Sequence, residues 1–182
     1  MILLGLGGNR VSHAGAPART LDAAVDALRD AGCMIAARSP LYESAPVGPA
    51  DQPWFVNMAL AVESDLPATA MLALCHRVED RFGRLRDRRW QARTLDIDLL
   101  DWRGAVLPDR TAWAREAGRM DAPEGLVLPH PRLHLRRFVL QPLADIAPGW
   151  RHPVLGIDIG SLVQTVADQS LRPLAGVSAP GD

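Results

Sequence analysis

Two aspartates separated by a single residue, Asp96 and Asp98, interrupt an otherwise apolar run, TLDIDLL at positions 94–100. On a strand, both carboxylates point to the same face, with Cα atoms roughly 6.6 Å apart. Two such charges about 5 Å apart repel each other by about 3 kcal/mol at an effective dielectric constant near 20. A divalent cation would remove that cost, and magnesium is the natural candidate because it binds carboxylate oxygens together with substrate phosphates. Neutralisation by nearby arginines and exposure on a solvated sheet face are the alternatives.

The segment that precedes the aspartates is rich in arginine. Guanidinium groups bind phosphates through paired hydrogen bonds and stay charged at neutral pH. Next to a carboxylate pair that suits magnesium, they indicate a magnesium–polyphosphate ligand. A solvated charged loop, balanced in part by Glu79, Asp80 and Asp87, is the alternative. The arginines are Arg81, Arg84, Arg86, Arg88, Arg89 and Arg93.

A second set of side chains lies in FVNMALAVE at 55–63, which alternates as a half-buried strand does. If helices cover the face with the larger aliphatic residues, Phe55 and Asn57 share the other face with Asp96 and Asp98. An aromatic ring and an amide suit a flat heterocycle with donor and acceptor edges. Alternatively, Phe55 belongs to the core and Asn57 caps a bulge.

The elements that must position these side chains follow from the apolar periodicity. ILLGL at 2–6 and the run at 94–100 have the pattern of buried strands, and residues 33–43 that of an extended segment. Amphipathic helices are predicted over 19–32 and from Pro67 to Gly83. The order β-α-β-β-α-β is that of a ferredoxin-like α+β fold with both helices on one sheet face. Further helices are predicted over 133–146 and 157–169, with a short one near 111–118 and long loops between them.

Length and composition set the class of protein. With 182 residues and 48% hydrophobic composition, we expect one domain at 1–171, followed by a mobile tail at 172–182. A net charge of −1 argues against a general polyanion binder. We find no signal peptide and no apolar run of membrane length, so we expect a soluble, cytoplasmic monomer with no nucleic-acid or membrane partner. Cys33 and Cys75 are expected to be buried and reduced.

Four blocks of the sequence resemble the 6-hydroxymethyl-7,8-dihydropterin pyrophosphokinases of folate biosynthesis. They are GLGGN at 5–9, LYESAPVGPADQPWFVN at 41–57, GRLRDRRWQARTLDIDLL at 83–100 and LPHPRLHLRRFVLQPL at 128–143. The resemblance covers most of the chain, in order. It implies transfer of the β,γ-pyrophosphate of ATP, the co-substrate, to the hydroxymethyl group of the pterin, with release of AMP.

The resemblance also implies roles for individual residues. Two magnesium ions would be held by Asp96 and Asp98, and the catalytic residues would be Arg84, Arg93, Asp96 and Asp98. The ATP site would contain Glu79, Arg84, Arg86, Arg89, Trp90, Arg93, His130 and Arg136. The pterin site would contain Ser44, Pro46, Val47, Phe55, Asn57, Asp96 and Phe138, with the two phenylalanines on opposite faces of the pterin.

The sequence departs from the family pattern in three places. Gln91 replaces the usual glycine before Ala-Arg, which reduces backbone freedom there. The loop between Arg84 and Trp90 is slightly shorter than in some members. The connection from Asp98 to His130 is longer than the family leads us to expect. A lid extension and an interface are alternatives for the extra segment, and we favour an inert loop.

Two other functions fit part of the pattern. A ferredoxin-like sheet with exposed aromatic residues can bind RNA, but the near-neutral charge and the missing RNA-binding signature argue against this. A magnesium-dependent phosphodiesterase would also use paired aspartates. Only the pyrophosphokinase requires ATP, magnesium and the hydroxymethyl pterin together.

Overall fold

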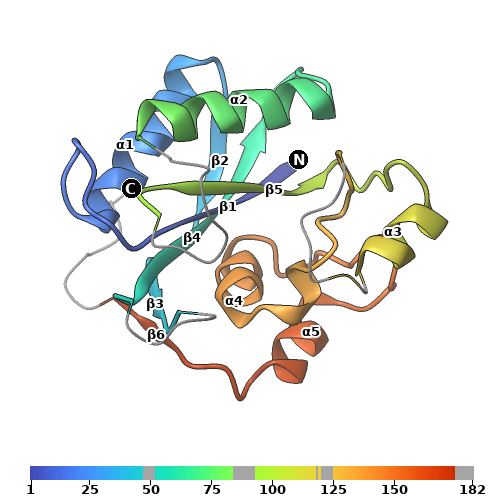
Figure 1. Cartoon of the computed structure of the whole chain (residues 1–182). Coiled ribbons are helices and arrows are strands. Elements are labelled where there is room, and N and C mark those ends of the chain that lie inside the picture. Colours follow the sequence, from blue (N-terminus) through green and yellow to red (C-terminus); the bar gives the residue numbers. More distant parts are fainter. Residues whose placement is uncertain (47–51, 84–92, 118, 120–124, 175–182) are drawn as a thin grey trace.

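The computed structural model describes residues 1–46, 52–83, 93–117, 119 and 125–174 (Figure 1). The strands are β1 (Ile2–Gly8), β2 (Met34–Arg38), β3 (Tyr42–Ser44), β4 (Phe55–Glu63), β5 (Asp96–Trp102) and β6 (Leu171–Pro173). The helices are α1 (Pro17–Asp30), α2 (Ala68–Arg81), α3 (Arg110–Ala117), α4 (Arg137–Ile146) and α5 (Ile159–Thr165), with a 3-10 turn η1 at Leu133–Leu135.

The sheet has the topology that the order of elements predicts. Its strands run β5-β1-β4-β3-β6, with β2 also paired to β4, and the pairs are antiparallel. Strand β1 lies between β4 and β5, so that Gly7 is opposite Asn57 on one side and Asp96 on the other. The ferredoxin-like βαββαβ core is therefore confirmed, and it brings together strands that lie far apart in the chain.

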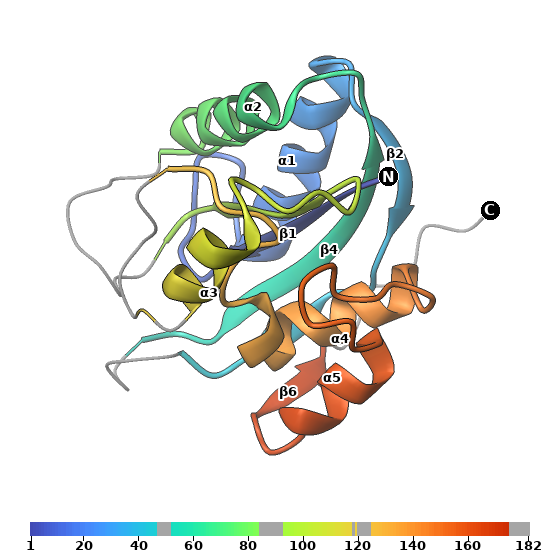
Figure 2. The ribbon, with the colours of Figure 1, turned by 90° about the vertical axis from the view of Figure 1, so that its right-hand side faces the viewer.

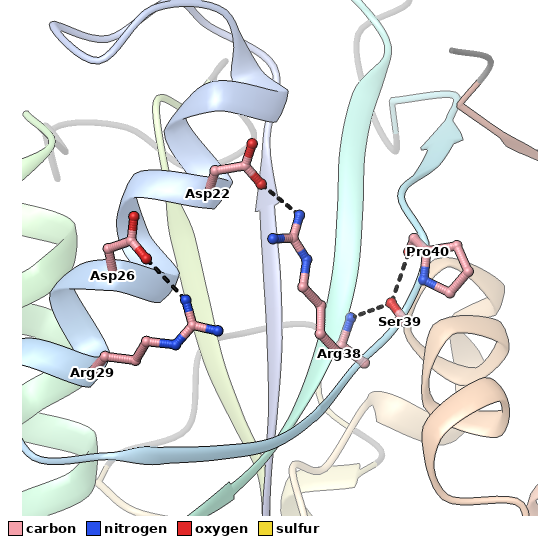
Figure 3. A network of polar contacts seen from close by, with 7 residues as sticks. Asp22, Asp26, Arg29, Arg38, Ser39 and Pro40 are labelled. Carbon is pink, nitrogen blue, oxygen red and sulfur yellow. Dashed lines mark hydrogen bonds and ion pairs between the residues drawn. The ribbon is translucent and has the colours of Figure 1, made fainter. Parts of the chain in front are cut away.

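The extended segment predicted at 33–43 is divided into β2 and β3 by a polar break (Figure 3). At the break, the Ser39 hydroxyl accepts the N–H of Ala59 at 2.9 Å and donates to the carbonyl of Pro40 at 2.8 Å. Next to it, Arg38 pairs with Asp22 of α1 at 2.5 Å. These contacts replace ladder hydrogen bonds that the break removes and join α1 to the edge of the sheet.

Helices lie against both faces of the sheet (Figures 1 and 2). As predicted, α1 and α2 lie on one face of the sheet; it is the face of β4 that carries the larger aliphatic side chains, and this layer forms the main core. On the other face, α4 and α5 form a second core with Leu3, Leu100 and two small residues, Ala59 and Ala61. Alanines at these positions allow α4 to approach the sheet closely. Because α4 covers only part of this face, Phe55 and Asn57 at the other end of β4 line an open pocket.

The C-terminal part differs in detail from the predicted elements. The helix predicted over 133–146 begins as the 3-10 turn η1 and continues as α4 from Arg137. Strand β6 pairs with β3 and extends the sheet. Two of its residues, Arg172 and Pro173, belong to the expected tail at 172–182, of which the structure describes residues 172–174. Residues 175–182 lie outside the described part of the chain.

Two further expectations concern single features. Cys33 and Cys75 are free and buried, as predicted. In the described residues, none of the helices has both the length and the apolar character needed to cross a membrane.

Candidate active site

A pocket of about 360 Å³ opens on the sheet face that α4 leaves uncovered. Strands β1, β4 and β5 form its floor, and the η1–α4 segment forms one wall. The sequence-predicted residues that line it are Ser44, Phe55, Asn57, Arg93, Asp96, Asp98, Arg136 and Phe138. Val47, Arg84, Arg86, Arg89 and Trp90 lie outside the described residues, as does Gln91. Pro46, Glu79 and His130 are described but do not line the pocket.

Glycine makes the floor of the pocket flat. Gly5 and Gly7 of β1 both line the pocket, and Gly7 separates Asn57 from Asp96 in the sheet. A Cβ atom at Gly7 would stand only 3.0 Å from the Asn57 Oδ1 atom, closer than a carbon and an oxygen normally approach. A larger residue here would displace the Asn57 amide or fill the space above the floor.

The two aspartates lie on the same face of β5, as the strand periodicity predicts, while Ile97 between them points into the main core. Arg93 Nη1 is 2.5 Å from Asp96 Oδ2, and Arg136 Nη1 is 3.6 Å from Asp98 Oδ2. The Asp96 side chain is 24% exposed and that of Asp98 is 32% exposed. The arginine partners expected as one alternative are thus present, and the carboxylates still face the pocket.

This donor set fits a magnesium ion that takes its remaining ligands from water and phosphate. Among the described residues, no group of three or more histidine, cysteine, aspartate or glutamate side chains could enclose a metal ion. The described residues therefore do not form a closed structural metal centre. Two carboxylates open to a pocket are instead typical of sites where the substrate supplies the other ligands.

His130 approaches Asp98 from beside the pocket, with Nε2 3.9 Å from Oδ1. The pKa of His130 is lowered to about 4, mainly by burial; the charge of Asp98 acts to raise it, and the charges of Arg136 and Arg132 act to lower it. Its Nδ1 accepts the backbone N–H of Arg132 at 3.2 Å. The neutral ring therefore carries its proton on Nε2 and presents a hydrogen-bond donor toward Asp98.

Glu79 supports the site from the opposite side of the sheet. It is fully buried on α2, where Oε1 accepts the backbone N–H of Ile97 at 2.7 Å. Since Ile97 lies between the two aspartates, this bond holds the part of β5 that displays them. The family resemblance identified Glu79 as a site residue without indicating on which side of the sheet it lies.

Phe55 and Phe138 provide apolar walls, and polar groups lie between them. Asn57 is 4% exposed and donates through Nδ2 to the Ser44 hydroxyl at 3.0 Å. The Arg136 guanidinium carbon lies 5.6 Å from the centre of the Phe138 ring. The pocket thus brings aromatic, amide and charged groups together, as expected for a ligand with a flat ring and phosphates.

Asn9 supports the pocket from outside its lining, and no role was predicted for it. It is 4% exposed, and its Oδ1 accepts the backbone N–H of Arg93 at 2.8 Å while its Nδ2 donates to the Pro53 carbonyl at 3.0 Å. The backbone N–H of Asn9 also donates to the carbonyl of Arg93 at 2.9 Å. Asn9 therefore fastens together two segments that carry pocket residues. The only signal was an amide directly after the glycine-rich end of the first strand.

Gln169 is a second residue without a predicted role, and no sequence pattern pointed to it. It lines the pocket, its Oε1 accepts the N–H of Arg137 at 2.9 Å, and its Nε2 donates to the carbonyl of Leu135 at 2.9 Å. These bonds satisfy backbone groups at the start of α4 that the helix itself leaves unpaired. The C-terminal segment consequently fixes the wall that carries Arg136 and Phe138.

An α+β sheet whose open face gathers carboxylates, arginines and aromatic side chains in one pocket defines an enzyme acting on a small, charged substrate. The family model described as 7,8-dihydro-6-hydroxymethylpterin-pyrophosphokinase (HPPK) matches residues 3–148, and the chain belongs to this family. The protein transfers pyrophosphate from ATP to hydroxymethyl dihydropterin in folate biosynthesis.

Individual relatives agree with this assignment. The chain is 40% identical over 146 residues to the 2-amino-4-hydroxy-6-hydroxymethyldihydropteridine pyrophosphokinase of Methylorubrum extorquens, covering 80% of this chain and 81% of that protein. It is 40% identical over 143 residues to the Pseudomonas aeruginosa protein of the same name, covering 78% and 80%. A crystal structure of a triple mutant of Plasmodium falciparum HPPK-DHPS matches with a TM-score of 0.66 at 15% identity, over 92% of this chain and 43% of that one, which shows a shared fold.

Proposed function

We propose that pyrophosphoryl transfer takes place in this pocket, with Asp96 and Asp98 as ligands of two magnesium ions. The observation that carries the proposal is that both carboxylates lie on one face of β5 and line the same pocket as Arg93 and Arg136. Magnesium prefers carboxylate oxygens as ligands, with phosphates and water as its further ligands. Bound magnesium would neutralise phosphate charge and polarise the substrate hydroxyl.

The basic residues are proposed to hold the phosphates of ATP. Arginine presents a fork of five N–H donors, so Arg93 and Arg136 can each contact a carboxylate and a phosphate oxygen together. His130 would donate its Nε2–H to a phosphate oxygen as a neutral group, without first taking up a proton. The resemblance supports the same site for Arg84, Arg86, Arg89 and Trp90. We assign Glu79 the role of holding β5 in place for this site.

The pterin is proposed to lie against the aromatic side chains of the pocket. Phe55 and Phe138 would contact the two faces of its ring, and the Gly7 floor leaves room for it. Asn57 is held by Ser44 and by its own burial, so its amide would recognise the ring edge with little loss of side-chain freedom. The family motif adds Pro46 and Val47 to the pterin site.

The transfer itself demands positioning more than covalent participation. The hydroxyl must approach the β-phosphorus in line with the departing AMP oxygen, and the protein must neutralise the phosphate oxygens while this happens. Arg93, Arg136 and the His130 N–H would supply fixed donors on one side of the phosphates, and a preorganised set of donors costs little rearrangement during the reaction. We assign no general base among the described residues.

The nucleic-acid-binding and phosphodiesterase alternatives each fit part of the pattern, but no feature of the described residues favours either of them over the pyrophosphokinase. The family assignment decides for the pyrophosphokinase. The monomeric state and the cytoplasmic location stay predictions from the sequence, which sedimentation and cell fractionation would test.

The test is an assay of AMP release in which ATP, magnesium and the pterin are each omitted in turn, applied to Asp98→Asn. Loss of one charged ligand should cost about 3 kcal/mol of transition-state stabilisation, or roughly 100-fold in kcat, and should move the magnesium dependence to higher concentration. Asp22→Asn is the matched control, because Asp22 is also an arginine-paired carboxylate but lies on α1, outside the pocket. Equal rates for Asp98→Asn and the control would remove the metal role.

A further inference from the structure

Helix α3 lies in the long connection between β5 and His130, and it is firmly docked. Its start is capped by Asp109, whose Oδ1 accepts the N–H of Ala112 at 2.9 Å. The Arg110 guanidinium donates to the carbonyls of Pro153 and Val154, each at 3.0 Å. These contacts give α3 a fixed position against the segment between α4 and α5, which an inert loop would not need.

The inner side of α3 reaches toward the active site through Trp113. This side chain is only 3% exposed, and its indole N–H donates to the carbonyl of Pro129 at 2.8 Å in a buried position. Pro129 directly precedes His130 in the chain. A buried hydrogen bond cannot be replaced by water when its donor is removed, so the position of the Pro129 carbonyl depends on Trp113.

The segment that contains His130 is held from three directions. Leu128 exchanges two backbone hydrogen bonds with Leu107, at 2.9 and 3.0 Å, and the N–H of His130 donates to the carbonyl of Leu100 on β5 at 2.8 Å. Trp113 supplies the third attachment; of the three, this attachment is made by a side chain and the other two by backbone groups. These bonds fix the backbone from which the His130 ring leaves, and the N–H of Arg132, which donates to its Nδ1 at 3.2 Å, completes an orientation with Nε2 toward Asp98.

We propose that α3 is a positioning element of the ATP site: Trp113, acting through the Pro129 carbonyl, orients the His130 ring toward Asp98 and the phosphates. Trp113 does not touch the pocket and is a positioning residue. The proposal rests on the proposed role of His130 in binding ATP. A purely structural role would require only that Trp113 fill its place in the core.

Trp113→Phe separates these roles, because it keeps an aromatic ring and removes the N–H donor. Trp150→Phe is the matched control: Trp150 contacts the same His152 ring, but its indole N–H donates to Asp101 at 2.9 Å. Two measurements are made on each variant. One is the nitrogen chemical shifts of the His130 ring without substrate, and the other is the KM for ATP and for the pterin.

For Trp113→Phe we expect shifted His130 signals and a KM for ATP raised roughly tenfold, the effect of one buried hydrogen bond, with the KM for the pterin unchanged. Trp150→Phe should leave the His130 signals in place. Unchanged His130 signals in Trp113→Phe, or equal shifts in both variants, would overturn the proposal. Shifted signals with a normal KM for ATP would instead refute the role of His130 in the ATP site, so the two failures are distinguishable.

A second variant covers the case in which Trp113→Phe folds poorly. Arg110→Ala removes the two bonds that dock α3 from outside and leaves the core intact. It should shift the His130 signals in the same direction by a smaller amount. A folded Arg110→Ala protein with wild-type His130 signals and wild-type KM for ATP would argue against α3 as a positioning element.

Discussion

Acid should destabilise this protein through His152, which lies at the centre of a buried aromatic cluster. The side chain is 0% exposed, and its ring centre lies 5.1 Å from that of Trp113 and 5.6 Å from that of Trp150. Its Nδ1 accepts the backbone N–H groups of Val154 and Leu155, each at 3.2 Å. Protonation would place an N–H on Nδ1 facing two other N–H donors, so the folded state strongly prefers the neutral ring.

The size of the effect follows from the pKa of His152. This pKa is lowered from 6.5 to about 4, mainly by burial and in smaller part by the neighbouring His134. Because the folded pKa is depressed, the unfolded chain binds more protons between these values, and stability is lost as pH falls from 6.5 toward 4. From the two pKa values, the loss between pH 7 and pH 5 is about 2 kcal/mol, and it approaches about 3 kcal/mol below pH 4.

Denaturant unfolding at pH 7, 6 and 5 measures this loss. The variant His152→Gln keeps an acceptor for the two N–H groups but does not titrate, so its stability should fall by about 2 kcal/mol less than that of the wild type over this range. Ile159→Val is the control, since it removes a buried methyl group at about 1 kcal/mol without changing a titratable residue. It should lower stability equally at each pH. If His152→Gln loses stability with acid as steeply as the wild type, the reasoning is wrong.

Two further substitutions test the pocket. Phe138→Ala should weaken pterin binding by roughly tenfold or more and leave ATP affinity nearly unchanged, as measured by calorimetric titration with each substrate; equal losses of both would mean that Phe138 serves only the core. Asn9→Ala breaks the bonds to Arg93 and Pro53 at once, so the backbone amides near both residues should exchange hydrogen faster and kcat/KM should fall for both substrates. Unchanged exchange at either segment would contradict the coupling that we assign to Asn9.

Several parts of the fold follow from local pattern alone. Strict alternation in 55–63 predicted which β4 side chains share a face, and the structure confirms it because side chains on a strand alternate whatever surrounds it. The same rule placed Asp96 and Asp98 on one face of β5. The glycines after the two long helices marked their ends, since a left-handed backbone there favours glycine.

The positions and contacts of several site residues could not be predicted from the sequence. Glu79 was recognised from a family motif, yet its carboxylate points to the backbone of β5 from the helix layer. Gln169 and Trp113 gave no signal, because their importance lies in backbone carbonyls and N–H groups more than fifteen residues away. The contacts of the extra connection were equally unpredictable: its helix is hydrogen-bonded through Arg110 to the carbonyl of Val154 and through Trp113 to that of Pro129. Hydrogen bonds between distant segments leave no periodic trace in a sequence.

The sequence by itself determined the order of the elements, the faces of the strands and the chemical groups available: paired carboxylates, arginines, two phenylalanines and an amide. Tertiary structure alone decided which of them meet. Pairing of β1 with both β4 and β5 sets Asn57 and Asp96 on either side of Gly7, and α4 leaves that end of the sheet uncovered. The physical reason is that periodicity is a local property of the backbone, whereas a pocket exists only where long-range packing stops short of covering a face.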